Sequence, residues 1–178
     1  MKNSMKVFIL LTLFLQLNAN TKKQYIAIGE SITMAETYTV PSKGMYELSL
    51  KYGYMLNRYF GVEARGVFQL AQHKELTHKY SYGLYLKPNI EISKNTNIYG
   101  LIGYSKNKLV KNETNFINNE TIQYDLSYGG GIEHEYAKNK YVYIDFVQYI
   151  DKSTTQPEGK YAIKINSVSM GLKYNFSF

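Results

Sequence analysis

Charged side chains recur at every second position in several segments of this chain, and they are the first residues that could do chemistry. A spacing of two places side chains on one face of a β-strand, so Glu63 and Arg65 would face the same way. Carboxylates there could act as acids or bases, line an ion path, or pair with the cations. The set consists of Glu47, Lys51, Glu63, Arg65, Lys87, Glu91, Asp125, Glu133, Glu135, Asp145 and Lys173.

Imidazole is the second group of interest, because it binds metal ions and transfers protons. The chain has three histidines, His73, His78 and His134, and Glu75 lies between the first two. A loop carboxylate and imidazoles could hold zinc or copper, but no standard ligand spacing is present. We therefore predict solvated loop residues at His73 and His78, and neither a metal nor another cofactor. The chain has no Cys, which excludes thiolate chemistry and disulfides.

The elements that carry these residues are predicted to be β-strands. Large apolar residues occupy every second position from 168 to 178, and small or polar residues fill the gaps. Similar alternation predicts strands at residues 24–31, 46–54, 60–70, 80–92, 98–105, 122–136, 141–150 and 168–178.

The facing of two predicted strands, 24–31 and 98–105, stays open. In the first, Glu30 suggests that even-numbered positions point inward, yet Ile26 and Ile28 share that face. A β-bulge could resolve the conflict. In the predicted strand 122–136, His134 falls on the apolar face.

The connections between these strands alternate in length. Residues 57–59, 93–97 and 137–140 are short and turn-like, whereas the polar segments 32–44, 71–79, 106–121 and 151–160 are longer. An even number of amphipathic strands with short turns at one end is typical of an outer-membrane barrel. Apolar side chains on every strand would then face lipid. The sequence thus predicts an all-β protein, an eight-stranded antiparallel up-and-down transmembrane β-barrel.

The start of the chain has the pattern of a secretory signal peptide. Lys2 and Lys6 precede an almost unbroken apolar stretch at 7–17, which is about half the ~20 residues of a membrane-spanning helix. We predict a signal peptide at 1–19 and an outer-membrane β-barrel domain at 20–178.

The eight amphipathic strands, the signal peptide and the aromatic ending resemble small outer-membrane β-barrel proteins, namely the OmpA-type membrane domain, OmpX-like proteins and opacity-type porin-like proteins. The resemblance implies a location in the bacterial outer membrane. It also implies that Tyr174, Phe176 and Phe178 form the signal that the barrel-assembly machinery reads.

Three functions are compatible with such a barrel. The first is a structural or surface-interaction role, the second is a narrow channel for ions or small solutes, and the third is a lipid A-modifying enzyme. An eight-stranded interior is just wide enough to be filled by side chains, which favours structural ion pairs over a channel. Lipid A deacylases of this shape resemble serine hydrolases, but no His here is followed two positions later by Ser, as their motif requires. We therefore predict that the chain is not an enzyme.

The chain is basic, with 21 Lys and Arg against 14 Asp and Glu. Basic loops would lie just above the phosphates of lipopolysaccharide, and an ordinary solvated surface is the alternative. The candidate contacts are Lys74, Lys79, Lys106, Lys108 and Lys111. We expect lipid, lipopolysaccharide, the assembly machinery and external ligands of the loops as partners. Export argues against nucleic acid, and we expect a monomer.

Overall fold

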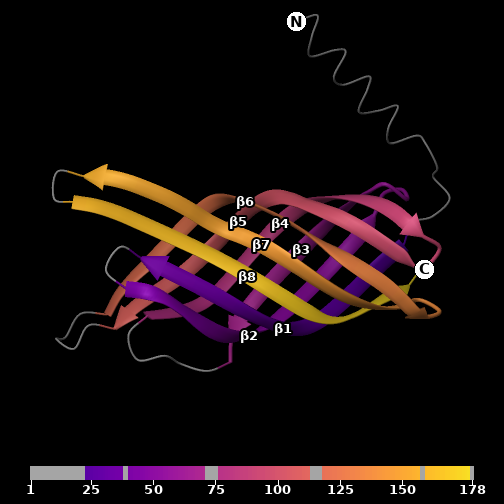
Figure 1. Ribbon diagram of the computed structural model, residues 1–178, viewed down its shortest axis with the longest axis horizontal. Coiled ribbons are helices and arrows are strands. Elements are labelled where there is room, and N and C mark those ends of the chain that lie inside the picture. Colours follow the sequence, from indigo (N-terminus) through magenta and orange to yellow (C-terminus); the bar gives the residue numbers. More distant parts are fainter. Residues whose placement is uncertain (1–22, 38–39, 71–75, 113–117, 157–158, 177–178) are drawn as a thin grey trace, which may run out of the picture.

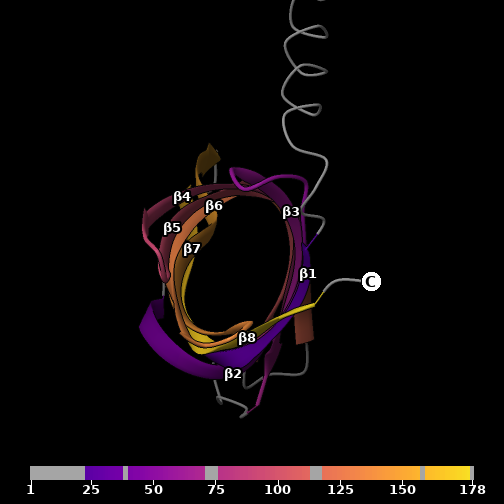
Figure 2. The same ribbon diagram turned by 90° about the vertical axis from the view of Figure 1, so that its right-hand side faces the viewer.

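Each alternating segment forms a β-strand in the computed structural model, and the strands follow chain order around a closed antiparallel barrel (Figure 1, Figure 2). The strands are β1 (Lys23–Thr37), β2 (Val40–Met55), β3 (Phe60–Gln69), β4 (Leu76–Ser93), β5 (Thr96–Asn112), β6 (Asn118–Ala137), β7 (Lys140–Gln156) and β8 (Gly159–Phe176). Pairing of β1 with β8 closes the barrel. The structure describes residues 23–37, 40–70, 76–112, 118–156 and 159–176. The predicted eight-stranded antiparallel barrel is confirmed.

Side chains alternate between a buried lumen and an exposed apolar outer face. On β4, Leu84 is 72% exposed whereas its neighbour Tyr85 is 2% exposed. Large apolar side chains on the outer face of every strand form the belt that lipid covers in barrels of this kind. Within the described residues, no helix has the length and apolar character needed to cross a membrane.

The two strands of uncertain facing both point their odd-numbered residues into the lumen. In β1, Tyr25 and Ala27 are buried, and in β5 Tyr99 and Leu101 are buried. The pairing of β1 with β2 is regular from Lys23 to Ala35, so the proposed bulge near Glu30 is absent from this segment. Glu30 therefore lies on the outer face.

Most of the residues predicted to form long loops are strand residues instead. The predicted loop 106–121, for example, is divided between β5, which ends at Asn112, and β6, which begins at Asn118. The predicted loops 32–44, 71–79 and 151–160 are shortened in the same way. The backbone pairing of the strands continues past the segments with apolar alternation. Strand residues that lie outside the lipid do not need an apolar face, so the alternation does not mark them. The hairpins at this end lie on the left in Figure 1.

Tyrosine rings fill the lumen where strands carry glycine. The Tyr25 ring lies over Gly53, where a Cβ atom would collide with it. The Tyr143 hydroxyl takes the corresponding place at Gly29. Glycine therefore makes room for large inward side chains in a narrow barrel.

Candidate functional site

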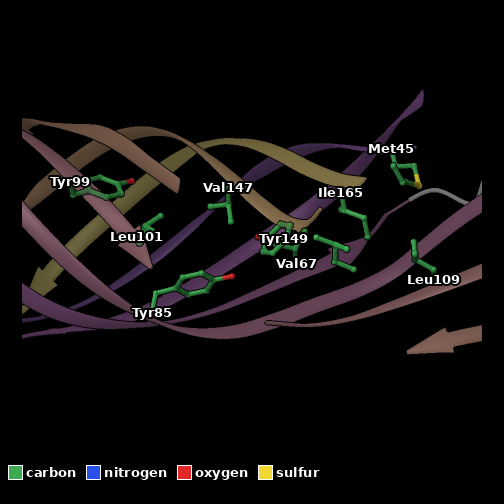
Figure 3. Packing of buried hydrophobic residues seen from close by; sticks show 11 residues of the cluster. Met45, Val67, Tyr85, Tyr99, Leu101, Leu109, Val147, Tyr149 and Ile165 are labelled. Carbon is green, nitrogen blue, oxygen red and sulfur yellow. The ribbon is translucent and has the colours of Figure 1, made fainter. Parts of the chain in front are cut away.

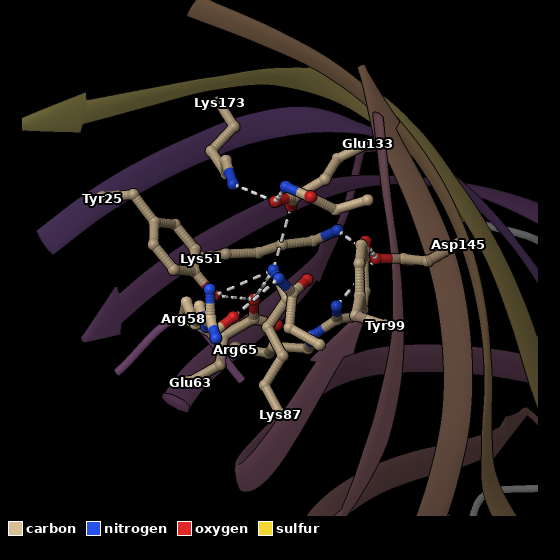
Figure 4. A network of polar contacts seen from close by, with 12 residues as sticks. Tyr25, Lys51, Arg58, Glu63, Arg65, Lys87, Tyr99, Glu133, Asp145 and Lys173 are labelled. Carbon is tan, nitrogen blue, oxygen red and sulfur yellow. Dashed lines mark hydrogen bonds and ion pairs between the residues drawn. The ribbon is translucent and has the colours of Figure 1, made fainter. Parts of the chain in front are cut away.

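Seven buried charges from six strands form a network inside the barrel (Figure 4). Asp145 on β7 accepts hydrogen bonds from Lys51 Nζ at 2.6 Å, from Arg65 Nη2 at 2.7 Å and from the Tyr99 hydroxyl at 2.8 Å. Glu63, next to Arg65 along the inner face of β3, accepts from Arg65 Nε and from the Tyr25 hydroxyl. These contacts join β1, β2, β3, β5 and β7 across the lumen.

Glu133 on β6 is the second centre of this network. It accepts hydrogen bonds from Lys173 Nζ at 2.5 Å and from Lys87 Nζ at 3.0 Å. Lys87 Nζ also lies 3.7 Å from a Glu63 oxygen and so links the two centres. We define the charge network as Lys51, Glu63, Arg65, Lys87, Glu133, Asp145 and Lys173.

The charge network is closed to solvent and held by aromatic rings. None of its members is more than 7% exposed. Lys51 Nζ lies 3.4 Å from the centre of the Tyr143 ring, and Lys87 Nζ lies 3.9 Å from that of Tyr99. Four cations face three carboxylates, so every carboxylate has at least two cationic neighbours. Groups fixed in this way suit a structural core better than a proton donor or an ion path.

A buried apolar layer, seen in Figure 3, adjoins the charge network and extends from it toward the loops. Along β3 the inward residue after Arg65 is Val67, and along β7 the inward residues after Asp145 are Val147 and Tyr149. The layer consists of Ala35, Met45, Val67, Tyr85, Tyr99, Leu101, Leu109, Val147, Tyr149, Ile150 and Ile165. Water and ions that enter the lumen from the loop end therefore meet the packed side chains of this layer before they reach the charge network.

A ring of side-chain hydrogen bonds lies beside this apolar layer, and it contains His78. The prediction that His78 is a solvated loop residue is wrong, because His78 lies in β4 and is fully buried. Its Nδ1 atom is 2.6 Å from Glu47 Oε1, and its Nε2 atom is 2.7 Å from Ser81 Oγ. Glu47, predicted among the lumen charges, thus pairs with imidazole and with the Thr33 hydroxyl.

Serine, histidine and glutamate in this order are the arrangement of a serine hydrolase. All three side chains are fully buried, however, and Ser81 Oγ donates to Asn107 Oδ1. The ring continues from Asn107 to Ser105 at 3.0 Å and from Ser105 to Ser127 at 2.5 Å. The hydroxyls therefore tie neighbouring strands together.

The other predicted lumen charges lie apart from the network. Glu91 is exposed beside the β4–β5 turn. Asp125 is half-buried on the inward side of β6 and accepts a hydrogen bond from the Leu126 amide. Glu135 accepts one from the amide of Asn139 in the β6–β7 turn.

The predicted lipopolysaccharide contacts are partly gathered on the outer face. Pairing across β4, β5 and β6 aligns Tyr82, Lys106 and Tyr124 in one row. Lys106 Nζ lies 5.6 Å from the centre of the Tyr82 ring and 5.4 Å from that of Tyr124. Lys108 is two positions further toward the loops and is half-buried.

The structure describes the remaining lysine candidates less completely. Lys79 is exposed at the start of β4, Lys74 lies outside the described residues, and only the backbone of Lys111 is described, in β5. His73 also lies outside the described residues, and His134 is exposed on β6 as predicted.

The C-terminal aromatic residues lie along β8. The rings of Tyr174 and Phe176 stack with their centres 6.4 Å apart, and Phe178 lies outside the described residues. The predicted signal peptide at 1–19 also lies outside them.

Comparison with known proteins identifies the family of this barrel. The model of the family described as outer membrane protein beta-barrel domain matches residues 7–176. The chain belongs to this family. It is thus a β-barrel of the Gram-negative outer membrane, as predicted. The short turns of such barrels face the periplasm. A search of curated proteins finds no match.

Solved structures share the fold of this outer-membrane barrel at low sequence identity. Ail of Yersinia pestis is 17% identical with a TM-score of 0.63, over 87% of this chain and 99% of Ail. Neisserial surface protein A is 16% identical with a TM-score of 0.63, over 86% and 97%. OprG of Pseudomonas aeruginosa is 13% identical with a TM-score of 0.59, over 89% and 97%.

Proposed function

We propose that this protein is a sealed surface barrel that binds the phosphates of lipopolysaccharide on its outer face. The observation that carries the proposal is the row Tyr82–Lys106–Tyr124. On β5, the outward residues Ile98, Ile102 and Tyr104 are exposed to lipid, and Lys106 is the next outward residue toward the loops. The ammonium group therefore lies where the belt ends and the headgroups begin.

The geometry of this row favours binding of an anionic headgroup by Lys106 over the alternative, an ordinary solvated lysine. Two tyrosines flank Lys106 and limit its positions, and phenol rings are at home at the headgroup level. Lys108 adds a second cation further from the membrane centre. A Lys near an anionic membrane surface contributes about 1 kcal/mol of attraction. Ail, which shares the fold, has been solved with the heparin analogue sucrose octasulfate, and this supports binding of polyanions by barrels of this shape.

Binding of labelled lipopolysaccharide to the barrel in detergent micelles tests the proposal. Replacing both lysines, Lys106→Gln with Lys108→Gln, should weaken binding about tenfold or more at low salt. The matched control is Lys164→Gln, an exposed lysine at the loop end of β8. Dephosphorylated lipopolysaccharide should bind equally weakly to all variants. Equal binding by the double variant and the control would contradict the proposal.

The packed interior supports a surface role over the two alternatives, a narrow channel and a lipid A-modifying enzyme. A channel would need a path through the charge network and the apolar layer, both of which are packed. A serine hydrolase built on Ser81, His78 and Glu47 would need access to Ser81, which is fully buried. The protein accordingly acts through its outer face and through loops that face external ligands.

A further inference from the structure

An apolar groove on the outer face of the barrel adjoins Lys106. It crosses β2, β3, β4, β5 and β6, and we call it the β3 groove after its middle part. At its loop end it is lined by Leu84, Tyr104 and Leu126, which pair with one another across β4, β5 and β6. Each of these residues is the next outward residue after a member of the row that contains Lys106. The groove therefore begins where the cation ends.

A small side chain on β3 forms the floor of this groove. Ala64 points outward and pairs with Tyr52 on β2 and with Leu84 on β4. These two neighbours face the same way and are 48% and 72% exposed. A large side chain thus stands on either side of a methyl group, and a linear hydrocarbon chain that lies between them contacts both.

Another groove of the outer face differs in charge. It lies over β1, β8 and β7, and the residues that line it include Glu30. The next outward residues toward the loops are Ile32, Phe146 and Val168, which are exposed and uncharged. An anionic headgroup above this groove would meet apolar side chains instead of a lysine. Charge therefore favours the β3 groove for an anionic lipid.

We propose that the β3 groove holds an acyl chain of the same lipopolysaccharide molecule whose phosphate Lys106 binds. This inference rests on the proposed function and narrows its ligand to lipid A, the acylated part of lipopolysaccharide. The phosphate and the chain belong to one molecule, so the two contacts reinforce each other. A soluble polyanion has access to the lysine alone.

Photo-cross-linking with lipid A that carries a diazirine on an acyl chain tests the groove. The natural full chain is placed in phosphatidylcholine vesicles that contain this probe as a minor component, and labelled residues are mapped by mass spectrometry. Label in the β3 groove should exceed label in the groove over β1, β8 and β7 about tenfold or more. Phosphatidylcholine with the same diazirine should label the two grooves within about twofold. Equal labelling of the grooves by lipid A, or the same preference with phosphatidylcholine, would overturn the proposal.

Filling the groove provides a second test that leaves Lys106 in place. Ala64→Phe should lower the lipid A label about tenfold, whereas Val142→Phe, which fills the groove over β1, β8 and β7, should leave it unchanged. Both barrels should fold, because an aromatic side chain suits the outer face. Full labelling of the Ala64→Phe barrel would contradict the proposal. If that variant does not fold, the map of the natural chain still decides.

Fully deacylated lipopolysaccharide separates this inference from the proposed function, because it keeps the phosphates and lacks the chains. In detergent micelles it should bind about tenfold more weakly than intact lipopolysaccharide. The double variant Lys106→Gln with Lys108→Gln should weaken the binding of both. Equally tight binding of the deacylated and intact forms would overturn the acyl-chain site and leave the proposed function standing. If the double variant changes neither, both the site and the proposed function are wrong.

Discussion

Removing the charge of Asp145 should destabilise the barrel more than any change at an exposed acid. Asp145→Asn keeps the size of the side chain but takes a full charge from a site where Lys51, Arg65 and Tyr99 converge within 2.8 Å. Four buried cations would then face two carboxylates instead of three. Loss of one partner from a buried ion pair costs about 3–5 kcal/mol. Arg65 keeps its bond to Glu63, so we expect about 3 kcal/mol.

The assay is urea unfolding in phospholipid vesicles, with the folded fraction measured by gel mobility without heating. Asp151→Asn is the matched control, because this acid lies on the same strand, is exposed and accepts a hydrogen bond from the side-chain amide of Gln148. It should change the unfolding free energy by about 0.5 kcal/mol or less. Adding Lys51→Met to Asp145→Asn should recover part of the loss, since it removes an unpaired cation. A loss below about 1 kcal/mol for Asp145→Asn, or no recovery, would refute the role of the charge network.

Two further predictions concern catalysis and assembly. A fluorophosphonate probe should leave Ser81 unlabelled in the folded barrel, and overexpression should leave lipid A unchanged, since Ser81, His78 and Glu47 are fully buried. Labelling of Ser81 would contradict the prediction that the chain is not an enzyme. Deleting Phe178 should lower the amount of folded protein in the outer membrane if the terminal aromatic residues are read during assembly, and normal levels would contradict that role.

The strands and the inward charges could be predicted because a period of two survives wherever one side faces lipid. Lys51, Glu63, Arg65 and Asp145 belong to the alternating polar set and do face the lumen. Which charge meets which could not be predicted, because those contacts cross the barrel between strands far apart in sequence. The tyrosines that contact the charge network also point into the lumen. In the sequence, the only sign of this is glycine at the positions against which their rings pack.

His78 shows the limit of a period-two argument. The register shifts between His78 and Tyr80, so the even-numbered His78 points inward although Tyr82 and Leu84 point outward. A β-bulge of this kind changes which residues point into the lumen, and the alternation in the sequence does not reveal it. Glu30 shows the opposite error, because regular pairing keeps an acid outside where polarity alone suggests the lumen.

Current recording across a planar bilayer tests the central claim, that the lumen is sealed and the protein acts from its outer face. The purified full chain is inserted in its folded form, and insertion is verified by the heat-dependent gel shift of the recovered protein. Packed charges and the apolar layer predict traces without conductance steps across many insertions. Reproducible steps from the natural chain would show an open path and would contradict the account.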